Sequence, residues 1–173
     1  VDSGKHHFVN DGWTMYDTMD ASFRFPGGSV IQWDGKSRNA YSTYGAGRGT
    51  IIYGTDGSVW MDRGGYRLYN REGKMISESQ SGGDEQGTAL GGGGSLTTRH
   101  VRNFAESIRG ESQPNAPIDE GVISTNLCHY ANISSRENNA LIEVDPVSGR
   151  LKDSALMERY WKREYESGWE PKV

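Results

Sequence analysis

The sequence predicts an α+β domain, in which a large, mainly antiparallel open β-sheet carries two or three helices packed on one face. Three short apolar or aromatic runs lie within residues 49–73, and the pairs that separate them, such as Asp56-Gly57 and Gly64-Gly65, favour two-residue hairpin turns. Apolar residues at helical spacing follow a stretch rich in glycine. This stretch therefore marks a hinge between a β part and a helical part.

The β part is predicted over residues 12–78 and begins with a long strand. Side chains alternate along this strand, so one face is wet, while Asp17 shares the other face with apolar residues. A turn at Pro26-Gly27-Gly28 starts the return strand, and Asp34-Gly35 ends it. In chain order, the predicted strands cover residues 15–25, 29–33, 51–54, 58–62 and 66–70.

The helical part is predicted over residues 97–138, after a glycine-rich connection at 79–96. Thr97 or Thr98 can cap the first helix, which carries one apolar stripe and stops at Gly110.

The second predicted helix covers residues 119–136, and its apolar residues lie most of the way round the helix. It is therefore expected to be buried on more than one side. A returning strand at 140–144 follows, and a C-terminal helix and tail occupy 153–173, with the helix at 154–166. Trp169 is expected to anchor the tail, which completes a single domain of 173 residues.

Composition argues against several classes of function. A net charge of -4 with scattered Lys and Arg does not suit a protein that binds nucleic acid electrostatically. No run approaches the roughly 20 apolar residues of a membrane-spanning helix. His, Cys and acidic residues show no metal-ligand spacing, and Cys128 is predicted to be a buried thiol because its neighbours are apolar. The glycine-rich run at 45–49 precedes a strand, which indicates a flexible connection rather than a phosphate-binding loop.

Five segments that span nearly the whole chain carry a family resemblance. They read FRFPGGSVIQWDGKS, GTIIYGTDGSV, HVRNFAESIRG followed by PNAPIDEG, STNLCHYANIS, and REYESGWE. In their order and spacing they resemble the C-terminal domain of the Gfo/Idh/MocA oxidoreductases, particularly the bacterial, sugar-related members. The resemblance implies a mainly antiparallel open sheet with helices on one face, and a second face used for dimerisation.

The resemblance also implies an enzyme larger than this chain. In complete members, an N-terminal Rossmann domain holds NAD or NADP, and hydride passes between the nicotinamide and a sugar or polyol. This sequence contains no βαβ unit with a dinucleotide fingerprint and no Glu-Lys-Pro stretch such as carries the family's catalytic lysine. The resemblance therefore places the catalytic residues and the cofactor site upstream of Val1, so that this domain alone is expected to bind no cofactor and to be inactive.

Candidate substrate contacts follow from the chemistry of sugar recognition. A sugar site needs an aromatic face for the apolar side of the ring, together with fixed hydrogen-bond donors and acceptors. The sequence offers this mixture at one predicted strand end, with two outlying candidates. The candidate substrate-binding residues are Trp33, Lys36, Ser37, Arg38 and Asn39, and the outlying pair is Trp13 and His129.

Each outlying or aromatic candidate has an alternative structural explanation. His129 forms a row with Asn126 and Asn132 on the second predicted helix, and a buried histidine beside two hydrogen-bonded amides would produce the same pattern. Packing in the core or at a dimer interface would equally account for Trp13 and Trp33.

Taken together, the sequence predicts the substrate-binding and oligomerisation domain of an NAD(P)-dependent oxidoreductase acting on a sugar or polyol. The alternative is a stand-alone carbohydrate-binding or protein-interaction β module. The expected partners are the sugar or polyol, the Rossmann domain of the same protein, and a second copy bound through the open sheet face. No nucleic acid is expected, and the sequence leaves the compartment, cytoplasmic or periplasmic, open.

Overall fold

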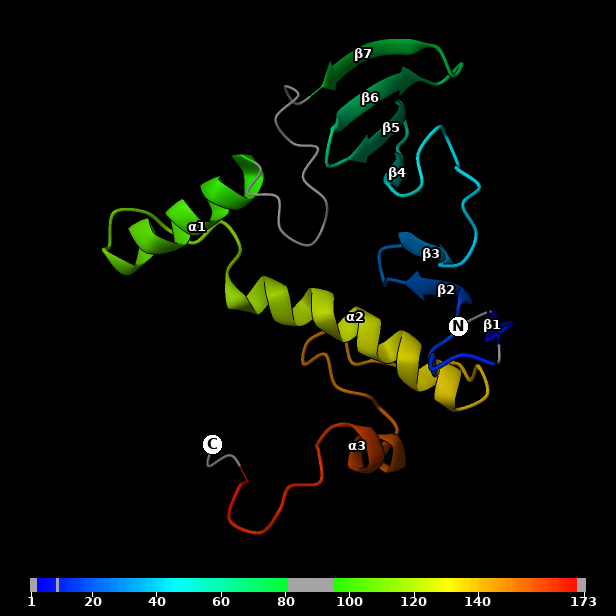
Figure 1. Cartoon of the computed structure of the whole chain (residues 1–173), viewed down its shortest axis with the longest axis vertical. Coiled ribbons are helices and arrows are strands. Elements are labelled where there is room, and N and C mark those ends of the chain that lie inside the picture. Colours follow the sequence, from blue (N-terminus) through cyan, green and yellow to red (C-terminus); the bar gives the residue numbers. More distant parts are fainter. Residues whose placement is uncertain (1–2, 9, 81–94, 171–173) are drawn as a thin grey trace. The chain divides into compact units, whose positions relative to one another are not determined.

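A computed structural model describes residues 3–8, 10–80 and 95–170 (Figure 1). The described residues form α-helices and two antiparallel sheets, one of three strands and one of four, which confirms the α+β class. The chain divides into two compact units. The first combines Val1–Asn39 with Ile118–Val173, and the second is Ala40–Pro117.

The first unit contains the three-stranded sheet, in the order β1-β2-β3. Its strands are β1 (Ser3–Lys5), β2 (Thr18–Arg24) and β3 (Val30–Lys36). The predicted turn joins β2 to β3: the Phe25 amide donates to the Ser29 carbonyl at 3.0 Å, and Gly28 adopts a φ of 83°. The predicted end of β3 at Asp34-Gly35 is wrong, because β2 supplies ladder partners for both residues and pairing continues to Lys36.

Register gives this sheet an apolar face and a polar face. Ala21, which is buried, lies directly opposite Trp33 on the apolar face. Thr18 lies directly opposite Lys36. Each is three positions from its neighbour in the first pair, Thr18 from Ala21 and Lys36 from Trp33, so their side chains point to the opposite, polar face. The polar pair therefore lies together at one end of the sheet.

The second unit contains a four-stranded meander, in which β7 adds to the three strands predicted from the hairpin pattern. Its strands are β4 (Thr50–Tyr53), β5 (Gly57–Asp62), β6 (Gly65–Asn70) and β7 (Met75–Gln80), hydrogen-bonded in chain order. Trp60 on β5 is the best-buried aromatic residue of this sheet, at 8% exposure. The Arg67 guanidinium covers its ring at 4.8 Å from the centroid, and Ile51 pairs with it from β4.

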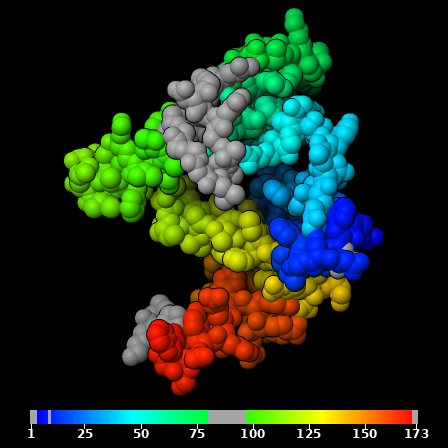
Figure 2. Space-filling view, in the orientation of Figure 1, coloured from blue at the N-terminus to red at the C-terminus, as the bar shows by residue number. Residues whose placement is uncertain are grey.

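Helix α1 (Ser95–Ile108) follows in the same unit and is followed by Gly110 with a φ of 77°, as predicted for a helix stop. Its predicted apolar stripe is present but exposed: Val101, Phe104 and Ile108 are all more than half accessible. The atoms of α1 are visible in light green in Figure 2.

Helix α2 (Ile118–Arg136) belongs to the first unit, and its burial is confined to its C-terminal end. Ile133 and Ser134 are buried there, and the Ser134 hydroxyl donates to the Ala140 carbonyl at 2.7 Å because the following chain folds back over this end. The first half has no such cover, so Ile123 is exposed. The prediction that the helix is buried on more than one side is thus wrong for its N-terminal half, and Cys128 is exposed rather than buried.

The predicted strand at 140–144 is also wrong: only one isolated bridge forms there, between Val144 and Leu151. The Asp145 carboxylate accepts hydrogen bonds from the Ser148 and Val147 amides at 2.7 and 3.1 Å, which makes a tight turn in place of a longer ladder.

Asp153 is the N-cap of helix α3 (Ser154–Tyr160), and its carboxylate accepts hydrogen bonds from two backbone amides of the first turn. It ends six residues earlier than predicted, because the sequence beyond Trp161 is charged and offers no continuous apolar face. Trp169 is 79% exposed, so the expected anchoring of the tail by this residue is wrong.

Candidate functional site

A cleft of about 310 Å³ lies at the end of the three-stranded sheet where Thr18 and Lys36 pair. Residues from three segments line it: the chain after β1, the start of β2, and the end of β3 with the loop that follows. The lining residues are His7, Phe8, Thr18, Lys36, Arg38 and Asn39. Three of the predicted substrate contacts, Lys36, Arg38 and Asn39, are thus brought together in one concave site.

Asp17 holds the walls of this cleft together. Its side chain is buried, at 2% exposure, and it lies on the apolar side of the strand alternation immediately before β2. Its carboxylate accepts hydrogen bonds from the backbone amides of His7 at 2.8 Å and Phe8 at 3.2 Å, and from the Thr18 hydroxyl at 3.0 Å. Its carbonyl accepts from the Ser37 amide at 2.8 Å. One residue therefore contacts all three segments that line the cleft.

These hydrogen bonds keep the Asp17 side chain ionised. Burial opposes the charged form, but the amides of Phe8 and His7 and the Thr18 hydroxyl outweigh it and hold the pKa below its usual value. The negative charge is thereby neutralised by fixed donors of the cleft wall, and Asp17 is itself not among the lining residues. Asp17 positions other groups and has no direct contact with the open space of the cleft.

Arg38 lies close to two aromatic rings. Its guanidinium carbon lies 5.3 Å from the centroid of Phe8 and 5.9 Å from that of Trp13, both within cation–π range. Asp11 forms an ion pair with Nη2 of Arg38. The Trp13 amide, at 2.9 Å, and then Arg38 lower the pKa of the Asp11 carboxyl and keep it charged. Trp13, predicted as an outlying contact, thus acts here through Arg38.

The loop after β3 is ordered by its backbone. The Asn39 amide donates to the Lys36 carbonyl at 3.2 Å, which closes a turn and directs Arg38 and Asn39 toward the cleft from successive positions. Ser37 lies in the same turn but does not line the cleft; its amide is the group bonded to Asp17. The Lys36 ammonium forms an ion pair with Asp34, two residues earlier on the same face of β3.

Besides Ser37 and Trp13, two more predicted contacts, Trp33 and His129, are not among the residues that line this cleft. Trp33 is 60% exposed and occupies the apolar face of β3, because it lies three positions before Lys36 and side chains alternate along a strand. His129 lies on α2 with an exposed side chain and is not among the lining residues. The prediction grouped Trp33 with Lys36 by proximity in sequence and ignored strand parity.

Sequence reasoning missed the other half of the cleft. His7 and Phe8 come from a segment with no strand periodicity, and their approach depends on the Asp17 carboxylate. One signal was available: an Asp in phase with apolar residues of a strand must find buried donors. That signal identifies Asp17 but not which amides it accepts from.

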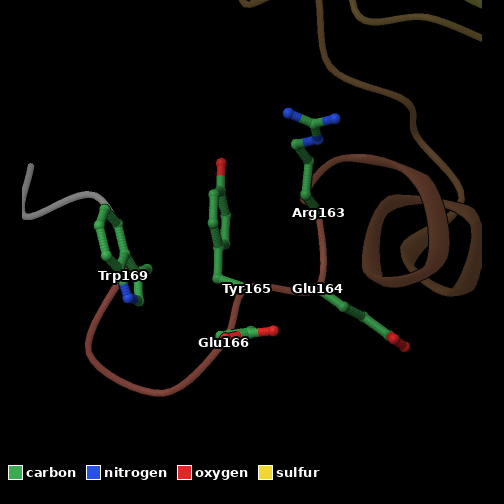
Figure 3. A pocket seen from close by; sticks show the side chains of 5 residues that line it. All are labelled: Arg163, Glu164, Tyr165, Glu166 and Trp169. Atoms are coloured by element: carbon green, nitrogen blue, oxygen red, sulfur yellow. The ribbon is translucent and has the colours of Figure 1, made fainter.

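A second, shallower hollow of about 330 Å³ is formed by the C-terminal segment alone (Figure 3). Tyr165 stands between Trp169 and Arg163 in this view, and Glu164 and Glu166 complete the lining. The turn that returns Trp169 toward Tyr165 is closed by a hydrogen bond from the Trp169 amide to the Glu166 carbonyl at 2.9 Å.

The described residues offer little to a nucleotide or a metal ion. Every strand pair among them is antiparallel, and the glycine-rich run at 45–49 leads into β4, so it does not present the amides of a helix N-terminus to a phosphate. These residues therefore do not fit a dinucleotide of the Rossmann type. Within residues 3–8, 10–80 and 95–170, no three His, Cys, Asp or Glu side chains are grouped as metal ligands would be, and no helix is long and apolar enough to cross a membrane.

A scan against protein-family models, a search of characterised proteins and a search of solved structures each return no match to this chain.

Proposed function

We propose that this chain is the substrate-binding and oligomerisation domain of an NAD(P)-dependent oxidoreductase that acts on a sugar or polyol, with the nucleotide held by a Rossmann domain outside these 173 residues. The observation that carries the proposal is the cleft, where Lys36, Arg38 and Asn39 meet the ring of Phe8 at one strand end. An aromatic face with several fixed donors around it is the arrangement that sugar recognition requires.

The geometry of the cleft supports binding of a hydroxylated ligand in particular. Arg38 and Lys36 offer donors that ion pairs hold in place, and the Thr18 hydroxyl, which donates its proton to Asp17, offers an acceptor. Asp17 fixes the backbone on both sides, so the site is largely formed before a ligand arrives. A preformed site loses less entropy on binding than one that must be ordered by its ligand.

Oligomerisation is proposed through one face of the β4–β7 sheet. Ile52, Val59 and Leu68 lie directly opposite one another across three strands, and Met61 pairs with Tyr66 on the same face. Ile52 is 52% exposed, and Tyr66 and Leu68 are also exposed. A contiguous apolar sheet face of this kind stays in water only at a cost, and a second copy of the same face covers it through a two-fold axis.

Two binding measurements test the proposed function on the 173-residue chain. Calorimetric titration with NAD⁺ and NADP⁺ is expected to give no heat of binding. Clear affinity for either nucleotide would contradict the proposal that a separate Rossmann domain holds the cofactor. Titration with sorbitol and glucose, followed by ¹H–¹⁵N NMR, is expected to shift the amide signals of Lys36, Arg38 and Asn39. Shifts confined to other residues would move the sugar site elsewhere.

The oligomer is tested by light scattering at increasing protein concentration, where a dimeric mass is expected. Leu68→Lys places a charge in the middle of the apolar face and is expected to return the mass to that of a monomer. Glu78→Gln is the matched control, since it makes the same change of one charge unit on the opposite, Trp60-bearing face of the sheet. Equal masses for wild type and both variants would remove this face from consideration.

The second candidate function, a stand-alone carbohydrate-binding or protein-interaction module, is favoured by one specific observation. The hollow in Figure 3 exposes Tyr165 and Trp169 beside charged side chains, as surface sites for sugar rings do. The NMR titration discriminates between the two, because this alternative predicts shifts at Trp169 and none at Arg38.

A further inference from the structure

The charge of the cleft lining differs from that of the chain as a whole. The chain carries 23 acidic and 19 basic residues, yet the six lining residues include Lys36, Arg38 and His7 and no acid. The acids that pair with Arg38 and Lys36, Asp11 and Asp34, are not lining residues. A ligand in the cleft therefore meets cationic donors directly.

Neither ion pair uses up the donors of its cation. Asp11 contacts Nη2 of Arg38, and a guanidinium has five N–H donors in a planar fork. Asp34 contacts the Lys36 ammonium, which has three. Both side chains are 40–50% exposed, 41% for Arg38 and 50% for Lys36, so their heads remain accessible to a ligand.

Arg38 is also unusually well oriented for a surface arginine. The rings of Phe8 and Trp13 lie within 6 Å of its guanidinium carbon, and Asp11 fixes one end of the fork. An arginine held in this way binds a carboxylate through two parallel hydrogen bonds with little further loss of side-chain entropy. Sorbitol or glucose, by contrast, offers only hydroxyl groups to the same fork.

We infer that the site takes a sugar or polyol that carries a carboxylate, an aldonate or a uronate, and this inference rests on the proposed function. Arg38 and Lys36 bind the carboxylate, the Phe8 ring faces the apolar side of the carbon chain or ring, and Thr18 and Asn39 contact hydroxyl groups. The carboxylate thereby fixes which end of the substrate enters the cleft first.

The test compares four ligands on the 173-residue chain by NMR titration: gluconate, glucuronate, sorbitol and glucose. The two acids are expected to bind about tenfold more tightly than the neutral pair, as one additional charge-assisted contact predicts. Raising the salt concentration from 0.05 to about 1 M is expected to narrow that difference, because exposed charges are screened. Acetate serves as a carboxylate without hydroxyl groups and is expected to bind far more weakly than gluconate.

Variants assign the effect to residues. Lys36→Gln and Arg38→Gln are each expected to remove most of the preference for gluconate over sorbitol, and Arg38→Lys to restore part of it. Lys162→Gln, an equal change of charge on an exposed residue of the same unit, is expected to leave the preference intact. If Arg38→Gln fails to fold, Lys36→Gln decides the question alone, since the cation stacked on the Phe8 and Trp13 rings is Arg38.

The possible outcomes separate this inference from the proposed function. Equal affinity for gluconate and sorbitol at the cleft overturns the inference and leaves the proposed function standing. Absence of binding by all four ligands overturns the proposed function, and the inference falls with it. Acetate binding as tight as gluconate binding overturns the sugar part of the inference.

Discussion

The β1–β3 sheet and the β4–β7 sheet use the same antiparallel pairing but are stabilised in different ways. The β4–β7 sheet consists of successive hairpins whose ladder has one register shift, at Leu68/Tyr69, and its most buried side chain is an aromatic ring, Trp60. The β1–β3 sheet has one strand of three residues, and its end is held by the buried carboxylate of Asp17. The β4–β7 sheet depends on local turns, and the β1–β3 sheet depends on one polar residue, Asp17.

This difference explains where the candidate site lies. A regular hairpin ladder satisfies its own backbone groups and leaves few donors or acceptors to hold a neighbouring loop. Asp17 instead accepts hydrogen bonds from two amides outside any strand, and this brings His7 and Phe8 beside Lys36. A buried polar group of this kind is costly unless every partner is present, so it specifies one arrangement of the loops around it.

The largest effect on stability is expected from Trp60→Ala in the meander. The substitution removes a buried indole and its stacking contact with the Arg67 guanidinium. It is expected to lower the free energy of unfolding by about 3 kcal/mol. Denaturant unfolding followed by circular dichroism measures the loss. Tyr41→Ala, at a residue that is 86% exposed, is the control and is expected to change it by less than about 0.5 kcal/mol. A similar loss for both variants would mean that the meander has no core at Trp60.

The second-largest effect is expected from Asp17→Ala in the three-stranded sheet. The substitution leaves the amides of His7 and Phe8 without an acceptor and is expected to lower Tm by about 5 °C. Asp17→Asn keeps one carbonyl oxygen and is expected to lose less. Unlike Trp60→Ala, both variants are expected to weaken ligand binding at the cleft. Unchanged binding by Asp17→Ala would show that the cleft walls do not depend on this carboxylate.

The parts of the fold that could be predicted from the sequence are those set by interactions between residues close together in the chain. The hairpins of the meander are encoded locally, and their strand pairs were predicted correctly. Each turn lies one residue earlier than predicted, at Thr55-Asp56 and Arg63-Gly64, because Gly57 and Gly65 already belong to β5 and β6. The prediction of a strand at 140–144 was wrong because the Asp145 carboxylate accepts hydrogen bonds from the Val147 and Ser148 amides. The chain turns there, and no ladder continues.

The candidate site was only half predicted for the same reason. Lys36, Arg38 and Asn39 follow one strand and share a local turn, so their proximity was visible in the sequence. His7 and Phe8 reach the cleft through hydrogen bonds to Asp17, ten and nine residues further along the chain, and no local pattern specifies which amides a buried carboxylate will bind. Trp33 was wrongly grouped with the cleft residues in space because strand parity places it on the opposite face.

A smaller effect is expected from acidification. The pKa of Asp17 is lower in the folded chain than its usual value of 3.8, so its ionised form adds stability above that value, and this contribution is lost as the pH falls through the folded pKa. Asp11, Glu137 and Asp145 have lowered pKa values as well and act in the same direction. The difference in Tm between wild type and Asp17→Asn isolates the one group. It is expected to be constant above about pH 5 and to narrow below about pH 4; a difference that grows on acidification would reverse the sign of the argument.

The smallest effect is expected at the hairpin turns, where the two sheets are alike. Gly28 in the first sheet and Gly73 in the second have φ values of 83° and 77°, and no heavy atom lies within 4 Å of the position that a Cβ would occupy at either. Replacement by Ala therefore costs only the strain of a left-handed backbone, about 1 kcal/mol in each turn. Gly27→Ala is the matched control, since its surroundings are equally open and its φ is not in the positive range, and a change near zero or slightly stabilising is expected. A large loss for Gly28→Ala but not for Gly73→Ala would mean that the three-stranded sheet depends on its turn as well as on Asp17.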